Sequence, residues 1–202
     1  MLHLILIRHG QTDWNAEQRY QGQTDIPLNN IGRQQAERLA RRLTEKEVDK
    51  LYASDLSRAY ETAEIVGQAI GIKPMADKRL RELGFGAIEG LTFSDAKTRY
   101  PEEMQAWLAN HTPLPEAELP DAFCRRVQSL LDDLRRDHDG QTVMLVGHGG
   151  PLRELLRLAF GLPPEGRWYF GMDNVSLSEL LVYDNSIRLL LMNDTCHLAD
   201  GA

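Results

Sequence analysis

Arg8 and His9 stand directly after an apolar run and directly before Gly10. The run 2–7 is apolar except for His3, as expected of a strand that is buried on both faces of a parallel sheet. A guanidinium and an imidazole at the carboxyl end of such a strand would form an anion site. A neutral imidazole can attack phosphorus while the guanidinium holds the phosphoryl oxygens. The pair therefore predicts phosphate chemistry at this strand end.

A second histidine has matching surroundings. His148 follows another buried strand pattern, 142–146, and lies between Gly147 and Gly149. Gly149 also opens a predicted helix, whose free backbone N–H groups favour an anion. Ligands of open α/β sheets bind outside the carboxyl ends of the strands, so His9 and His148 are expected to meet in one pocket.

Arg58 is the third candidate, in the first turn of a helix that follows a strand ending near Ala53. A cation at a helix N-terminus opposes the helix dipole, and this position makes sense if the side chain is directed at an anion. The alternative is a solvated arginine paired with Asp55 or Glu61.

The elements that would carry these residues alternate between strands and helices. The pattern predicts strands at 2–7, 48–53, 142–146, 175–183 and 187–192, and helices within 29–43, 56–70, 123–134 and 149–160, with a long loop at 13–28. This order predicts an α/β fold, a three-layer α/β/α sandwich with a mostly parallel sheet, an antiparallel edge strand and a small helical lid insertion.

The lid is expected at about 84–122, inside a single domain that spans 1–202. Its short helical pieces lie near 94–100 and 102–109. Between Gly84 and Asp121 the sequence holds seven Asp or Glu residues against only Lys97 and Arg99. The lid is therefore predicted to be acidic and poor in cations.

The formal charge of the chain is −7, which argues against nucleic acid as a partner. An anionic substrate must therefore be attracted by a local positive pocket. No apolar run approaches the roughly 18 residues of a membrane span, so no membrane partner is expected. Cys124 and Cys196 have no CxxC spacing, which favours reduced thiols in a cytoplasmic protein. The hairpin expected at 175–192 could support a homodimer.

The segment 8–15, Arg-His-Gly-Gln-Thr-Asp-Trp-Asn, closely resembles the signature of the histidine phosphatase superfamily, in its phosphoglycerate mutase-like branch. The resemblance covers most of the chain in the expected order. Its further segments are 21–22, 25–28, 32, 35–36, 54–59, 80–86, 89–91 and 146–150.

The resemblance implies a nucleophilic His9 that becomes a phosphohistidine, and a general acid, Glu82, that protonates the leaving alkoxide and then activates water. Glu89 is the rival for this acid role. No metal or other cofactor is implied, because cationic groups can stabilise the transferred phosphoryl group. The phosphate clamp would consist of Arg8, Arg58 and His148. Further substrate-binding groups would be Asn15, Gln21, Gly22 and Gly149.

Related mutases resemble one another in a basic pair after a lid tryptophan, whereas Trp107 is followed here by Leu-Ala-Asn. A phosphatase is therefore favoured over a phosphoglycerate mutase. The segments 80–86 and 193–198 resemble α-ribazole phosphatases and broad small-molecule phosphatases, and phosphoserine phosphatases share much of the pattern. The expected partner is a small phosphorylated metabolite. A non-catalytic protein that binds phosphorylated ligands is the alternative from another class.

Overall fold

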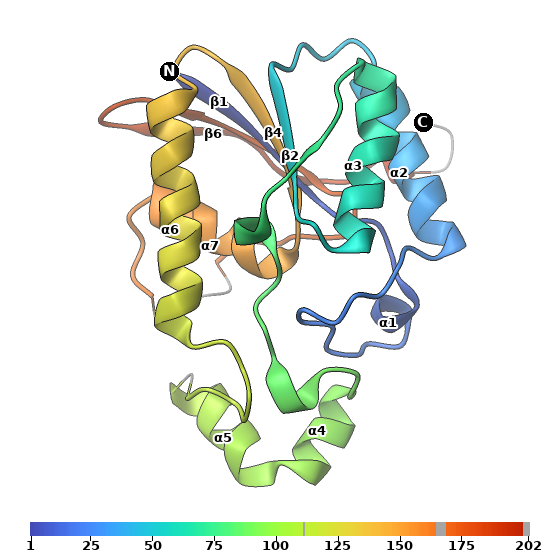
Figure 1. The fold of residues 1–202 in the computed structure, drawn as a ribbon, viewed down its shortest axis with the longest axis vertical. Coiled ribbons are helices and arrows are strands. Elements are labelled where there is room, and N and C mark those ends of the chain that lie inside the picture. Colours follow the sequence, from blue (N-terminus) through green and yellow to red (C-terminus); the bar gives the residue numbers. More distant parts are fainter. Residues whose placement is uncertain (111, 165–168, 200–202) are drawn as a thin grey trace.

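The computed structural model describes residues 1–110, 112–164 and 169–199. Its centre is a six-stranded sheet in the order β3-β2-β4-β1-β5-β6 (Figure 1). The strands are β1 (Leu2–Arg8), β2 (Lys50–Ala53), β3 (Met75–Ala76), β4 (Thr142–Gly147), β5 (Leu177–Val182) and β6 (Ile187–Asp194). Strands β1 to β4 pair in parallel, and β5 pairs antiparallel with both β1 and β6. The predicted fold class is confirmed, with the antiparallel hairpin at one edge of the sheet.

Two helical layers cover the sheet, as Figure 1 shows. The helices are α2 (Asn30–Leu43) and α3 (Ser57–Ile70) on one face, and α6 (Pro120–Asp137) and α7 (Gly149–Ala159) on the other. Strand β1 alternates between the two cores: Ile5 and Ile7 pack with the first helix pair, and Leu4 and Leu6 with the second. Burial on both faces explains why the strand reads as a continuous apolar run.

Local signals fix most helix ends. Asn29 caps α2 by accepting a hydrogen bond from Gly32 N, and α3 ends at Gly71 in the left-handed conformation. The prediction that 13–28 is a loop without helix is wrong at one place, because α1 (Asp13–Ala16) forms a single helical turn there. Reciprocal hydrogen bonds between Thr12 and Asn15 hold this turn, and they leave no trace in hydrophobic periodicity.

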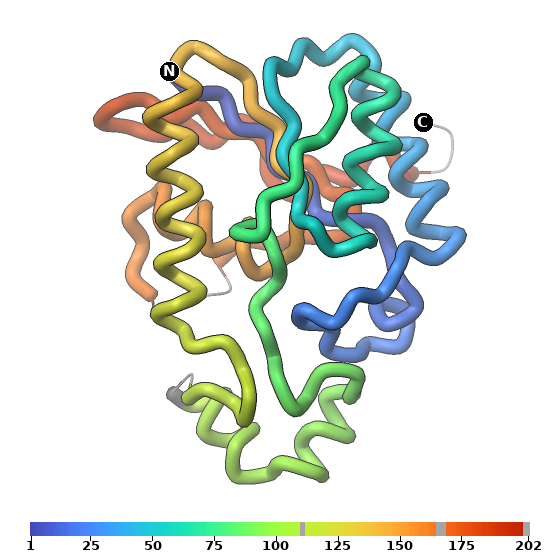
Figure 2. The backbone as a smooth tube through the Cα atoms, viewed as in Figure 1, coloured from blue at the N-terminus to red at the C-terminus, as the bar shows by residue number. Residues whose placement is uncertain are grey.

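Residues 84–119, called the 84–119 segment below, lie apart from the sheet (Figures 1 and 2). The segment contains η2 (Gly86–Ile88), α4 (Phe93–Arg99) and α5 (Pro101–Asn110), and the tube in Figure 2 enters it after η1 (Lys78–Leu80). It has a small core of its own, formed by Ile88, Ala96, Met104 and Leu114. Within the described part of the chain, no helix is both long and apolar enough to cross a membrane.

Candidate active site

The carboxyl ends of β1 and β4 bring the two histidines together. Arg8 pairs with Gly147 in the parallel ladder, so His9 and His148 each lie one residue past a strand end. The backbone N–H of His9 donates to the carbonyl of Gly147 over 2.9 Å. The two imidazole centroids are 5.0 Å apart. The two histidines therefore lie side by side at the strand ends, as the strand pattern predicts. The site that they form with Arg8 and Arg58 is called the strand-end pocket below.

His9 is held as a neutral imidazole with one free basic nitrogen. Its side chain is buried, and Nδ1 lies 2.7 Å from the carbonyl oxygen of Gly10. A carbonyl only accepts, so Nδ1 carries the proton and Nε2 is the basic atom. Burial, followed by the charges of Arg58 and Arg8, holds the His9 pKa well below its ordinary value. At neutral pH, His9 is in the form that can act as a nucleophile.

Arg58 is completely buried at the start of α3. Its Nη1 and Nη2 donate to the carbonyls of Thr24 and Gly22, both over 2.8 Å, and its Nε donates to His148 Nδ1 over 3.2 Å. Burial lowers the Arg58 pKa to about 10, which leaves the guanidinium charged at neutral pH. Arg58 therefore brings a permanent positive charge to the pocket.

The alternative interpretation of Arg58 as a surface ion-pair partner is wrong. Asp55 accepts two hydrogen bonds from Arg81, each 2.7 Å long. Glu61 pairs with Arg33 over 2.6 Å. Both carboxylates proposed as partners of Arg58 are thus occupied by other arginines.

Arg8 shares the unusual surroundings of Arg58. Its Nη1 donates to the carbonyl of Met172 over 2.6 Å, and its buried Nε has no hydrogen-bond partner among the described residues. Burial lowers its pKa. In the described chain, neither arginine forms a salt bridge with a carboxylate. A half-buried cation (Arg8) and a buried one (Arg58), neither in a salt bridge, make a site that favours an anionic ligand.

His148 is also buried and neutral. Burial and the charge of Arg58 hold its pKa well below the ordinary value. Because Nδ1 accepts from Arg58, Nε2 carries the proton and donates to Ser54 Oγ over 2.9 Å. In this arrangement His148 orients the Arg58 guanidinium, and both of its ring nitrogens are engaged by the protein.

Glu82 lies at the N-terminus of α7. Its Oε1 accepts from Leu83 N over 2.9 Å and from Gly150 N over 3.0 Å. A Cβ atom on Gly150 would lie 2.1 Å from this oxygen, so the approach requires glycine. Arg126 donates to the Glu82 carbonyl over 2.9 Å and fixes the backbone on the other side.

Glu89, the rival for the acid role, is engaged by backbone N–H groups from two loops. Its Oε1 accepts from the backbone N–H groups of Gln23 and Phe85, and its Oε2 accepts from that of Thr24. These bonds tie the 21–24 loop to the beginning of the 84–119 segment. Both carboxylate oxygens of Glu89 are therefore occupied in holding these two segments together.

The four predicted binding residues lie in different local contacts. Asn15 Oδ1 accepts from Thr12 N, and Gln21 Oε1 accepts from Thr12 Oγ1. Gly22 offers its carbonyl to Arg58. Gly149 is the first residue of α7. Of these four residues, Gln21 and Gly22 shape the loop that holds Arg58.

Several residues close to the site are not marked by any motif or periodicity in the sequence. Asn174 donates to the carbonyl of His9 over 2.9 Å, and Thr62 Oγ1 accepts from Gly10 N over 3.1 Å. Arg153 donates to the carbonyl of Phe170 over 2.9 Å, and the charge of Glu82 acts on it. These residues come from distant parts of the chain, so only the fold reveals their proximity. Among the described residues, no group of three or more His, Cys, Asp or Glu could hold a metal ion.

The chain is similar to known proteins in family pattern, in sequence and in structure. A family model described as the histidine phosphatase superfamily (branch 1) matches residues 4–195. Phosphoserine phosphatase 1 of Hydrogenobacter thermophilus is 32% identical over 202 residues, covering 99% of this chain and 96% of that protein. Phosphoglycerate mutase-like protein 4 of Arabidopsis thaliana is 34% identical, with coverage of 98% and 87%. The crystal structure of the α-ribazole phosphatase from Shigella flexneri superimposes with a TM-score of 0.89 at 29% identity, covering 96% of both chains.

Proposed function

The chain belongs to the histidine phosphatase superfamily, and we propose that it is a metal-independent phosphomonoester hydrolase that works through a phosphohistidine on His9. The single observation that carries this proposal is the state of His9. Its Nδ1 is fixed by Gly10, its pKa is lowered by burial, and Arg58 and Arg8 lie close enough for their charges to act on it. A neutral nucleophile beside two cations that form no salt bridge suits attack on a phosphate dianion.

In the first step, His9 Nε2 forms a bond to phosphorus as the bond to the ester oxygen breaks. Arg8 and Arg58 bind the phosphoryl oxygens, and the N–H of Gly149 and the side chain of Asn15 add donors. His148 supports this step by holding Arg58 Nε. Protonated Glu82 gives its proton to the leaving alkoxide, which departs as an alcohol.

In the second step, water attacks the phosphohistidine. Glu82, now a carboxylate, accepts a proton from the water, and the phosphorus–nitrogen bond breaks. Inorganic phosphate leaves, His9 returns to its neutral form, and Glu82 is protonated for the next cycle. The fixed position of Glu82 at Gly150 supports one residue serving in both directions.

The substrate would be a small phosphorylated metabolite, with phosphoserine and α-ribazole phosphate as the leading candidates. The named activities of two similar proteins support this pair. A phosphoglycerate mutase is the alternative within the family, since a similar protein is named mutase-like. A mutase must hold a second anionic group, and the cation-poor sequence between Gly84 and Asp121 argues against this role. Non-catalytic binding of phosphorylated ligands is the alternative outside catalysis.

The decisive experiment is to trap the phosphoenzyme. The protein is mixed with ³²P-labelled phosphoserine in EDTA and quenched with alkali, which preserves phosphohistidine, or with acid, which hydrolyses it. Covalent label is expected after the alkaline quench, and it should be lost in acid and absent from His9→Asn. Turnover of p-nitrophenyl phosphate without trapped label would contradict the covalent mechanism. Binding of phosphate without any turnover would favour the non-catalytic alternative.

A further inference from the structure

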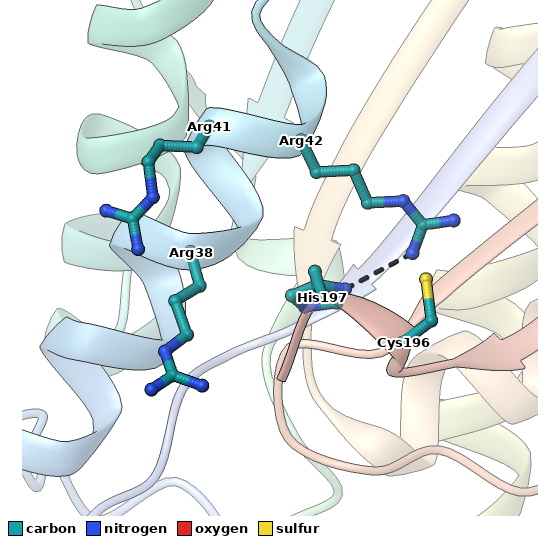
Figure 3. A pocket seen from close by; sticks show the side chains of 5 residues that line it. All are labelled: Arg38, Arg41, Arg42, Cys196 and His197. Atoms are coloured by element: carbon teal, nitrogen blue, oxygen red, sulfur yellow. Dashed lines mark hydrogen bonds between the residues drawn. The ribbon is translucent and has the colours of Figure 1, made fainter. Parts of the chain in front are cut away.

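A second cavity lies between α2 and η3 (Cys196–Leu198), as Figure 3 shows. Its volume is about 370 Å³, within the range of small-molecule sites. It is lined by Arg38, Arg41, Arg42, Cys196 and His197.

This cavity is distinct from the strand-end pocket. Helix α2 begins close to that pocket, because a Cβ atom on Gly32 would lie 2.1 Å from the carbonyl oxygen of Gln11. The three arginines belong to its later turns and lie about 12 to 18 Å along the axis from its first residue. A ligand here would therefore be separate from a phosphoryl group on His9.

The polar contacts in the cavity use only part of the arginine donors. Arg38 Nη1 donates to the carbonyl of Leu198 over 2.9 Å. Arg42 donates to Asp194 Oδ2 over 2.6 Å and to His197 Nδ1 over 3.2 Å. Each guanidinium has five N–H donors, so Arg38 and Arg42 both keep further donors for a ligand. Arg41 is exposed at the rim.

The balance of charge favours an anion. His197 is 5% exposed, and burial together with the charge of Arg42 lowers its pKa, so this ring is neutral at pH 7. Three arginines therefore line the cavity in a chain whose formal charge is −7, and among the described residues only Arg42 of the three forms a salt bridge, with Asp194. Like charges three and four residues apart on a helix repel one another. A bound anion would relieve this repulsion, and guanidinium groups match the geometry of phosphate oxygens.

We propose that the cavity between α2 and η3 binds a small phosphate-bearing anion at the guanidinium groups of Arg38, Arg41 and Arg42. Free phosphate and the phosphate group of a metabolite share this chemistry. The site does not depend on the proposed activity at His9, because none of its lining residues belongs to the strand-end pocket.

Cys196 provides a reporter, because its exposed thiol lines the cavity. In a Cys124→Ala background, its reaction with the neutral reagent 4,4′-dithiodipyridine is followed while inorganic phosphate is added. At a phosphate concentration ten times the Kd, the reaction should slow about tenfold by mass action. Chloride at equal ionic strength should have little effect. Phenylphosphonate, a non-hydrolysable ester analogue, serves as the second arm: tighter protection than phosphate indicates a metabolite, and equal protection indicates free phosphate.

The matched variants are Arg38→Gln with Arg41→Gln in the cavity, and Arg135→Gln with Arg136→Gln on α6. The cavity pair should abolish protection while turnover of p-nitrophenyl phosphate and the melting temperature stay unchanged. The α6 pair should keep full protection. Equal protection by chloride and phosphate, or protection that survives the cavity pair, would overturn the proposal. Loss of turnover in His9→Asn with protection intact would separate the two sites.

Discussion

The strand-end pocket and the 84–119 segment hold their charged side chains in opposite ways. In the pocket, Arg8 and Arg58 donate to backbone carbonyls and to a neutral histidine, so their positive charge remains available. At the segment, Glu89 is bound by backbone N–H groups, and Glu118 pairs with Arg126 over 2.7 Å. The pocket thus keeps its positive charge for a ligand, whereas the charged side chains of the segment are engaged by neighbouring parts of the chain.

This difference distinguishes charged residues that serve the chemistry from those that serve the structure. An arginine held by carbonyls is expensive to bury and gains from an added anion. An arginine held by a carboxylate is already neutralised and gains little. We therefore expect large catalytic effects from the pocket and small ones from the segment, and four predictions test this contrast in order of size.

The largest effect is expected for Arg58→Ala. Removal of a buried cation that stabilises a phosphoryl transition state should lower kcat/KM for p-nitrophenyl phosphate by about 10,000-fold. Arg58→Lys should recover little of this, since an ammonium cannot reproduce the fork that contacts Gly22, Thr24 and His148. Steady-state kinetics give the comparison, with melting temperatures to verify folding.

Arg33→Ala is the matched control for Arg58→Ala. Arg33 pairs with Glu61 on the same helix as Arg58, but this pair is partly exposed. Its loss should change kcat/KM by less than about threefold, as expected for a surface ion pair. Similar losses in both variants would mean that the carbonyl-held and carboxylate-held arginines do not differ in function.

The next effect is expected for Glu82→Gln. Glutamine keeps the shape and can still accept from Gly150 N, but it cannot transfer a proton. For phosphoserine, whose alkoxide is a poor leaving group, kcat should fall about 1,000-fold. For p-nitrophenyl phosphate, whose phenolate leaves without a proton, the initial burst of p-nitrophenol should be nearly unchanged. Equal losses of the burst and of phosphoserine turnover would contradict the acid role, and Glu89→Gln is the comparison variant.

The positions of the charged residues in the pocket could be predicted from the sequence, because the patterns that mark them are local. Arg8 ends a buried strand, His9 follows it directly, and Arg58 occupies the first turn of a helix, so their positions follow from hydrophobic patterns alone. The roles assigned to Glu82 and His148 depended on the family resemblance. The meeting of His9 with His148 then followed from the rule for parallel strand ends.

The remainder depends on contacts between distant residues. Ser54 orients His148 across 94 positions, and Asn174 reaches His9 across 165 positions. A serine or asparagine in a loop has many possible partners, and only the packed chain selects one of them. The division of acidic residues in the 84–119 segment into structural and exposed ones is likewise invisible in a count of charges.

The third prediction concerns the free energy of unfolding, which should fall at acidic pH because of the two buried histidines in the pocket. His9 and His148 are buried with lowered pKa values, so the unfolded state binds more protons than the folded state below pH 6.5. The contribution of the two neutral histidines to the free energy of unfolding is fully present above pH 6.5. It is lost as the pH falls toward their lowered pKa values in the folded state. Between pH 7.5 and 5.5, each histidine should cost about 1.4 kcal/mol of unfolding free energy. Urea denaturation at the two pH values measures this loss.

His9→Asn provides the control, because it removes one of the two histidines. The loss between pH 7.5 and 5.5 should then shrink by about 1.4 kcal/mol relative to the unmodified chain. The carboxylates with lowered pKa values, such as Asp55, titrate below this window and should not contribute. A free energy of unfolding that does not change between the two pH values would show that the pocket carries no such cost.

The smallest effect is expected for the exposed acids of α5. Glu102 and Glu103 lie in its first turn, where they favour the helix dipole but make no ion pair among the described residues. Changing both to Gln should lower KM for phosphoserine by less than about threefold, because exposed charges are screened beyond about 8 Å at physiological salt. The matched pair Glu45→Gln with Glu47→Gln, exposed beyond the end of α2, should have no effect. A tenfold fall in KM for the α5 pair alone would mean that the 84–119 segment reads the substrate's charge directly, and the contrast between the two regions would then fail at this point.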